Sequence, residues 1–252
     1  ARRHGLLHTP LVLPWGTPLD DLTLEASMRA TPGVGWLWAV HCETSTGMLN
    51  DIELLHRAAA RHGADLALDA ASSVGTLPVD LSSVAFASTV SGKALGGAPG
   101  LALVCSVERV PPAQGRIPRY LDLGLYLCGD GIPFTQPSPL VGALAEAVVS
   151  TDWRARFGAV RDASRCLRER LGAAGVRLVT PECHASPAVF TLVVPTGRDA
   201  PALARRIERE GFLIGWRSYY LRERRWIQLA LMGDFPASRL DALADAVERA
   251  WS

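Results

Sequence analysis

Short apolar runs alternate with amphipathic stretches over the first two-fifths of the chain. This alternation is typical of βαβ units and predicts a parallel sheet flanked by helices. The apolar runs tend to end in a polar residue, and ligands bind at such strand ends in sheets of this kind. The expected strands are Leu11–Leu13, Leu37–His41, Leu66–Asp69, Ala85–Val90 and Leu101–Ser106.

Residues that favour helix ends set the boundaries of the helices between these strands. Thr17 followed by Pro18 predicts an N-cap and a first helical position, and this helix extends to Arg29. Asn50 with Glu53 three residues later resembles a capping box and predicts the start of a second helix.

The part of the chain after residue 150 predicts a second, smaller α+β unit. We place the boundary near residue 150, which gives domains of residues 1–150 and 151–252. Helices are expected at Ser138–Val149, Asp152–Leu171, Pro201–Glu210 and Ala237–Trp251, and strands at Arg177–Val179, Val189–Val194 and Trp226–Leu231.

Composition narrows the function classes. Hydrophobic residues make up 48% and charged residues 20% of the chain, which is ordinary for a globular protein with a sizeable core. A net charge of +1 does not favour nucleic acid or an acidic membrane as a partner. No apolar run approaches the roughly 18–20 residues that cross a bilayer. Five scattered cysteines argue against a disulfide framework or a metal site and favour a reducing cytoplasm.

The basic residues are distributed very unevenly between two types. Of 26, a single one is lysine, Lys93, and the others are arginine. One interpretation is a bias that replaces lysine wherever only a surface charge is needed. Arginine keeps its proton near neutral pH, whereas a desolvated lysine amine can lose it and attack a carbonyl group. A single retained lysine is what a Schiff-base requirement predicts.

Four runs carry candidate chemistry, and their order along the chain is informative. His41–Gly47 reads H-C-E-T-S-T-G directly after an expected strand. Asp69–Ser73 places an acid at the end of the next strand. Ser91–Lys93 precedes a glycine-rich turn at Gly96–Gly100, and Pro133–Ser138 leads into an expected helix.

Together these runs resemble the class V aminotransferases, and most of all the 2-aminoethylphosphonate:pyruvate and alanine:glyoxylate transaminases. The likeness is strong from about residue 10 to about residue 145 and continues weakly to Met232-Gly233-Asp234. It implies the α/β fold of fold-type-I transferases that depend on pyridoxal phosphate (PLP). That fold has a mostly parallel large-domain sheet with helices on both faces and a small C-terminal α+β domain.

The resemblance assigns the two catalytic roles. Lys93 is expected to form the Schiff base with PLP and then to move a proton between substrate and cofactor. Asp69 is expected to pair with the pyridine nitrogen and keep it protonated. An acid at a strand end also acts as a helix cap or turn former in many proteins, but Lys93 at the matching downstream position favours the cofactor role.

Further cofactor contacts follow from the same resemblance. Thr44 and Ser45 are expected to hydrogen-bond the ring or phosphate edge, although both also suit a turn. Ser72 and Ser91 are assigned to the cofactor site as well. Thr135 is expected to reach the phosphate of a neighbouring subunit, which implies a homodimer, although its position also suits an ordinary loop residue.

Three departures from the family pattern limit the resemblance. The segment that supplies a phosphate-binding turn and a ring-stacking aromatic in the family has no counterpart before Thr46, so we expect the N-terminal part of the large domain to be absent. Gly92 stands where a larger polar residue is usual. Gln228 stands where an arginine binds the substrate carboxylate, and either Arg217 or one of Arg222, Arg224 and Arg225 replaces it, or the substrate is not an ordinary α-amino acid.

The sequence thus predicts a PLP-dependent aminotransferase that acts on a small amine or amino acid with a keto acid as partner substrate. The same cofactor and fold also support a lyase, a decarboxylase or a desulfurase. Cys128 does not match the position of a desulfurase cysteine. The alternative from another class is a non-catalytic subunit that keeps the fold, which Gly92 and Gln228 favour and which Asp69 and Lys93 oppose.

Overall fold

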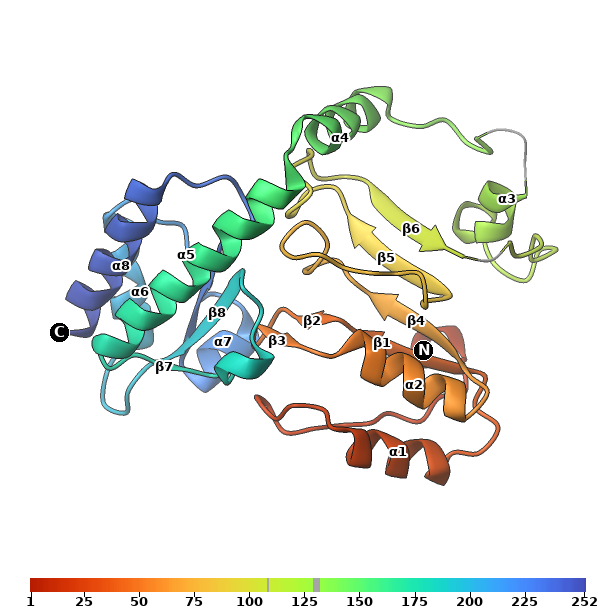
Figure 1. Cartoon of the computed structure of the whole chain (residues 1–252), viewed down its shortest axis with the longest axis horizontal. Helices are drawn as coiled ribbons and strands as arrows, with labels where there is room; N and C mark the ends of the chain where they lie inside the picture. Colours follow the sequence, from red (N-terminus) through yellow and green to blue (C-terminus); the bar gives the residue numbers. More distant parts are fainter. Residues whose placement is uncertain (108, 129–131) are drawn as a thin grey trace.

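The computed structural model describes residues 1–107, 109–128 and 132–252. Its main sheet has four strands in the order β1-β4-β5-β6 (Figure 1). The first three pair in parallel and β6 is antiparallel to β5, which confirms a mostly parallel sheet. The strands are β1 (Trp36–Val40), β4 (Asp65–Asp69), β5 (Phe86–Val90) and β6 (Ala102–Ser106). The strand expected at Leu11–Leu13 is wrong, because that segment forms no ladder.

Two helices pack on this sheet, and both begin later than the sequence patterns predicted. α1 spans Asp21–Ala30, and Asp20 caps it by accepting from the Thr23 amide at 2.7 Å. α2 spans Ile52–Arg61, and Asp51 caps it through the Glu53 amide. The caps expected at Thr17 and Asn50 are therefore wrong. In both helices an aspartate nearer the helix supplies the side-chain acceptor that an N-cap requires.

The helices cover one face of the sheet. Leu66 and Leu68 of β4 point toward Leu24 of α1 and Leu55 of α2, and these residues belong to one buried cluster. Side chains alternate between the two faces along a strand, so every second side chain points to the opposite face. That face is open to solvent. On that face the β1 side chains Trp36 and Trp38 are 50% and 69% exposed.

A short hairpin follows β1 and carries the first motif. β2 (Cys42–Glu43) and β3 (Met48–Leu49) pair antiparallel, and four residues connect them. Gly47 in this connection has a φ of 78°, and a Cβ there would lie 2.4 Å from the Val189 carbonyl oxygen. Glycine therefore permits the hairpin to approach the second half of the chain closely.

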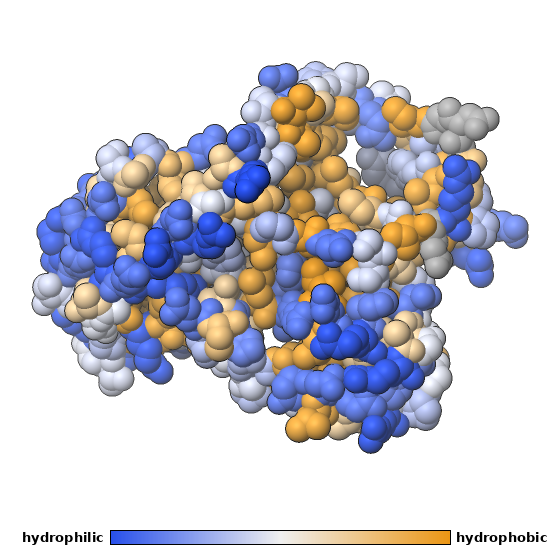
Figure 2. All heavy atoms as spheres, viewed as in Figure 1, coloured by the Kyte–Doolittle hydropathy of each residue, from blue (hydrophilic) through white to orange (hydrophobic). Residues whose placement is uncertain are grey.

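The segment after β6 contains two helices. α3 spans Leu123–Leu127 and α4 spans Ser138–Ser150, with Pro139 in its first turn as expected. Most of α4 is exposed although it is strongly apolar, and its exposed residues include Val141, Val148 and Val149. In Figure 2 hydrophobic side chains gather at the top of the molecule, where α4 lies in Figure 1.

The rest of the chain forms a three-stranded antiparallel sheet, in the order β7-β8-β9, with helices around it. Its core includes Leu167, Phe190, Ile227 and Val247, and it is separate from the first cluster. The elements are α5 (Trp153–Ala173), β7 (Arg177–Leu178), β8 (Val189–Val193), α6 (Ala200–Arg209), α7 (Tyr219–Arg224), β9 (Trp226–Ala230) and α8 (Ala237–Trp251).

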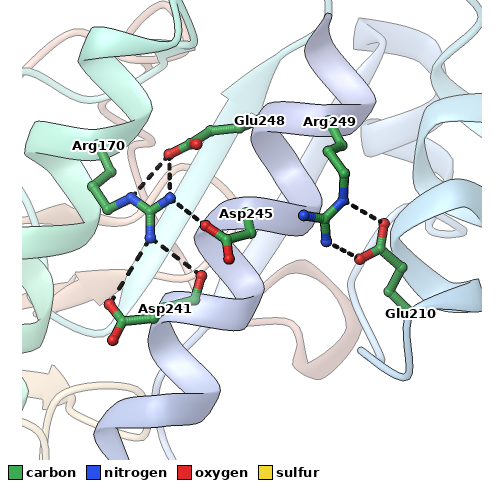
Figure 3. Close-up of polar contacts among 6 residues, drawn as sticks. All are labelled: Arg170, Glu210, Asp241, Asp245, Glu248 and Arg249. Carbon is green, nitrogen blue, oxygen red and sulfur yellow. Dashed lines mark hydrogen bonds and ion pairs between the residues drawn. The ribbon is translucent and has the colours of Figure 1, made fainter.

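Arginines join the helices of this second half at the surface (Figure 3). Arg170 of α5 lies 2.5 Å from Asp245 and 2.7 Å from Glu248, both on α8. Arg249 of α8 pairs with Glu210 at the end of α6. Exposed pairs of this kind contribute about 0–1 kcal/mol each, so they orient the helices while the apolar core supplies most of the stability. Within the described residues, no helix is long and apolar enough to cross a membrane.

Candidate active site

The expected catalytic residues meet at one edge of the main sheet. Asp69 ends β4, and Lys93 follows the end of β5. The hairpin that carries Thr44 follows β1. These three strands are parallel, so their carboxyl ends lie at the same edge, where α/β sheets bind ligands.

One hydroxyl group holds the side chain of Lys93, and a second hydroxyl group contacts the first. Its amine donates to Ser72 Oγ at 2.7 Å. Thr44 Oγ1 lies 2.5 Å from the same Ser72 oxygen, and either hydroxyl can donate in that pair. Ser72 is buried, whereas Thr44 and Lys93 are half-buried. The structure therefore brings together three of the residues that the resemblance assigned to the cofactor.

Asp69 keeps part of its carboxylate available. Oδ1 accepts from the Ala71 amide at 2.9 Å, which orients the side chain at the strand end. The main chain of Asp69 pairs with Val40 on one side and Ser88 on the other. Among the described residues Asp69 and Lys93 do not form an ion pair with each other. An acid and an amine thus stand at one sheet edge without neutralising each other.

Two of the expected cofactor ligands are engaged with the protein itself. Ser45 is buried, and its hydroxyl donates to Glu43 at 2.7 Å within the hairpin. Ser91 is fully buried and donates to the Ala98 carbonyl at 2.7 Å. It also accepts from the Leu101 amide, so it closes the glycine-rich turn after Lys93. Both hydroxyl groups shape the loops that carry Thr44 and Lys93.

Close packing explains why glycine precedes Lys93. A Cβ on Gly92 would lie 2.6 Å from both Cα and Cβ of Pro99. The glycine-rich turn therefore fills the volume of the larger residue that is usual in the family. Gly75, near Asp69, meets a similar limit, because a Cβ there would lie 2.6 Å from the Ala94 carbonyl carbon.

Gln228 connects the second half of the chain to this edge. It lies on β9, and its side-chain amide donates to the Thr44 carbonyl at 2.6 Å and to Thr191 Oγ1 at 2.9 Å. Thr191 is buried on β8 and donates in turn to the Ser45 carbonyl at 3.1 Å. Gln228 therefore stands beside the site, as expected, but its amide nitrogen already has protein partners. Thr191 was missed because an isolated threonine in an apolar strand carries no sequence signal.

Two of the four arginines considered as replacements, Arg217 and Arg224, are engaged elsewhere. Arg217 forms a bidentate pair with Glu208 at 2.6 and 2.9 Å, and its guanidinium lies 4.3 Å from the centre of the Trp216 ring. Arg224 stacks on Trp15 at 4.2 Å. A guanidinium already paired and stacked has to give up those contacts before it can bind a substrate carboxylate.

Arg156 also meets this edge, and sequence reasoning missed it among the many arginines of α5. Its guanidinium donates to the Gly75 carbonyl at 3.2 Å, to the Met232 carbonyl at 2.7 Å and to Asp234 at 2.6 Å. It therefore ties the loop after Asp69 to the Met232-Gly233-Asp234 motif.

His41 and Cys42 lie between β1 and the hairpin turn that carries Thr44. Both are buried, and the buried His41 Nδ1 atom has no hydrogen-bond partner among the residues that the structure describes. Burial lowers the pKa of His41, with nearby Asp51 opposing the shift, and burial raises the pKa of Cys42 to about 11. A hollow of about 610 Å³ beside His41 is lined by α2, by residues 77–83 and by His184, and neither Lys93 nor Asp69 lines it.

Thr135 lies apart from these residues in sequence and structure. It is exposed, in the irregular segment before α4. Among the described residues, no hydrogen bond joins it to Lys93, Asp69 or Thr44. A contact between Thr135 and a cofactor site stays a prediction that requires a second subunit.

Sequence comparison finds known proteins that are similar to parts of this chain. Residues 22–113 match the family model described as aminotransferase class-V. The chain is 29% identical to a 2-aminoethylphosphonate–pyruvate transaminase of Pseudomonas fluorescens over 211 residues, which cover 78% of this chain and 57% of the relative. It is 30% identical to the same enzyme of Aeromonas hydrophila over 229 residues, with 85% and 60% covered. The chain thus spans less than two thirds of these relatives.

Solved structures agree on the fold. An alanine–glyoxylate aminotransferase from Nostoc sp. superposes with a TM-score of 0.80 at 25% identity, covering 95% of this chain and 67% of that one. A ureidoglycine–glyoxylate aminotransferase from Bacillus subtilis gives 0.84 at 21% identity, with 95% and 66% covered. The motifs, the matching segment, the sequence relatives and the shared fold agree: the chain is similar to the class V aminotransferases.

Proposed function

We propose that this protein is a PLP-dependent aminotransferase that transfers an amino group between a small amine or amino acid and a keto acid. The observation that carries the proposal is the placement of Lys93, the only lysine of the chain, at the same sheet edge as Asp69. The transaminase relatives support the reaction class.

The residues present fit this cofactor. A half-buried carboxylate with one oxygen held by a main-chain amide suits a protonated ring nitrogen. The Lys93 amine donates to the neutral hydroxyl of Ser72. It can therefore break this hydrogen bond without separating an ion pair. When bound, PLP supplies an aldehyde for amine exchange and a ring that accepts electrons.

The chain contributes positioning and proton transfer. Lys93 Nζ is the base that takes a proton from the substrate carbon and returns it. Asp69 keeps a positive charge on the ring nitrogen, because an ionised carboxylate stabilises a nearby cation. Ser72 holds the amine before reaction and Thr44 contacts Ser72, whereas Ser45 and Ser91 maintain the loops that carry Thr44 and Lys93.

The substrate site differs from that of an enzyme for ordinary α-amino acids. Gln228 offers a neutral amide, and its nitrogen already donates to Thr44 and Thr191. Arg217 is paired with Glu208. Charge-assisted hydrogen bonds contribute roughly 1.5–3 kcal/mol each, so an α-carboxylate without a guanidinium partner binds weakly. This supports a substrate other than an ordinary α-amino acid.

We further propose a homodimer that works in the cytoplasm. Thr135 is exposed directly before α4, and α4 presents Val141, Val148 and Val149 to solvent. An exposed apolar helix beside an expected cofactor ligand supports a contact with a second copy. The free cysteines, including the exposed Cys105, support a reducing compartment.

Borohydride reduction of the protein after incubation with PLP tests the proposal. We expect one modified peptide, containing Lys93, because this is the only lysine. Lys93→Ala should abolish that product, whereas Arg57→Lys, a new lysine on the exposed surface of α2, should add little labelling. Loss of a visible absorbance band on reduction should accompany the labelling. Reduction that labels only the N-terminal amine, in folded protein saturated with PLP, would favour a non-catalytic subunit.

A further inference from the structure

Gln228 lies on a strand whose main chain is hydrogen-bonded on both sides. Its main chain pairs with Thr191 of β8 on one side. On the other side it exchanges hydrogen bonds with Gly215 at 2.7 and 2.9 Å. A Cβ on Gly215 would lie 3.3 Å from the Cβ of Gln228, so the strand has little freedom to shift. The amide is therefore presented from a rigid element.

The partner of this amide is a main-chain atom of the catalytic hairpin. Gln228 Nε2 lies 2.6 Å from the Thr44 carbonyl oxygen and 3.4 Å from that of Ser45. Both of its hydrogens have acceptors, because Thr191 Oγ1 lies at 2.9 Å. Gln228, which departs from the family pattern, thus holds the backbone of Thr44 in place across 184 positions of sequence.

The contact continues to the amine. With its carbonyl held, Thr44 directs Oγ1 to Ser72 Oγ at 2.5 Å. Ser72 Oγ in turn accepts from Lys93 Nζ at 2.7 Å. Ser72 is buried, so water competes little for these hydrogen bonds. A continuous set of three contacts therefore runs from the second sheet to the reactive side chain.

We propose that Gln228 is a positioning residue that holds the amine of Lys93 through Thr44 and Ser72. This role replaces the carboxylate-binding role that the family pattern assigns to the position. The inference rests on the proposed function in treating Lys93 as the reactive amine. It concerns the amine in the absence of PLP, so it can be tested separately.

The single lysine makes a direct measurement possible. The full chain, freed of PLP, is acylated at one fixed pH with the N-hydroxysuccinimide ester of acetic acid, and mass spectrometry gives the labelling of the Lys93 peptide. A lysine introduced at the exposed position 57 of α2, as Arg57→Lys in every protein compared, serves as the internal standard. The measured quantity is the ratio of the two labelling rates.

Ser72→Ala removes the direct acceptor and should raise the ratio about five-fold, which corresponds to the loss of one ordinary hydrogen bond. Gln228→Glu keeps the shape but replaces the donor with a carboxylate beside carbonyl oxygens, so it should raise the ratio by a similar factor. Ser72→Thr keeps a hydroxyl and should restore most of the wild-type ratio. Gln228→Met replaces Gln228→Glu if that variant does not fold.

The matched control is Thr180→Val. Thr180 Oγ1 donates to the Thr46 carbonyl at 2.8 Å, so it also joins the second half of the chain to the hairpin without contacting Thr44. We expect its melting temperature to fall while the ratio stays within two-fold. The inference is overturned if either Gln228→Glu or Ser72→Ala leaves the labelling ratio unchanged. It is also overturned if Thr180→Val raises the ratio as much as Gln228→Glu does. If the labelling ratios are as expected but the protein has no transaminase activity, the proposed function is overturned and the positioning role of Gln228 stands.

Discussion

At the scale of single residues, burial gives His41 a measurable effect on stability. The ring is buried with Nδ1 unpartnered, and burial lowers its pKa. The unfolded chain therefore takes up a proton first as the pH falls through about 6.5. Stability from the neutral ring is complete above that pH and is lost below it. We expect His41→Asn to reduce the loss of unfolding free energy between pH 7.5 and 5.5, by up to about 1.4 kcal/mol per pH unit.

Urea unfolding at the two pH values measures this effect. His8→Asn is the control, because His8 is exposed and should leave the pH dependence unchanged. An equal acid-induced loss in His41→Asn and the wild type would show that the ring is not held neutral.

At the scale of elements, the turn between β5 and β6 depends on Gly92. Placing a serine there, closer to the family pattern, would put its Cβ 2.6 Å from Pro99. Overpacking of this kind costs about 1–3 kcal/mol. We therefore expect Gly92→Ser to lower the free energy of unfolding by that amount, measured by urea titration. We also expect it to weaken PLP binding, measured by titration with PLP.

Gly142→Ala in α4 is the matched control, because a Cβ there meets no atom within 4 Å. It should raise stability by about 0.5–1 kcal/mol, as alanine favours a helix more than glycine does. If Gly92→Ser is as stable as the wild type, the turn adapts more readily than its packing indicates.

At the scale of the whole molecule, the exposed apolar helix α4 and Thr135 predict assembly. We expect light scattering to show a two-fold dimer or a multiple of one. Thr135→Ala should weaken PLP binding by about ten-fold, the loss expected for one hydrogen bond to a charged phosphate, without changing the dimer. Thr135→Ser should bind PLP nearly as well as the wild type. A monomer with full PLP occupancy contradicts the proposed assembly.

Local patterns in the sequence determined much of this protein. Apolar runs located β4, β5 and β6 to within a residue, because short apolar runs bounded by turn residues are typical of strands. The motifs predicted Lys93 and Asp69 as catalytic residues. The structure places both at the carboxyl ends of parallel strands, and their roles stay predictions. The helix starts at Thr17 and Asn50 were wrong, because several adjacent residues can cap a helix and the tertiary packing selects one.

Tertiary structure alone decided how these residues are connected. The contact of Gln228 with Thr44 joins β9 to the turn between β2 and β3, and no sequence periodicity reports a pairing across such a separation. The engagement of Arg217 by Glu208 and the close approach of Pro99 to Gly92 likewise depend on how whole elements pack. The division near residue 150 stays a prediction. Sequence thus specified the chemical groups and the strand ends that carry them, whereas packing chose their partners, because hydrogen bonds between distant segments form only once both backbones are fixed.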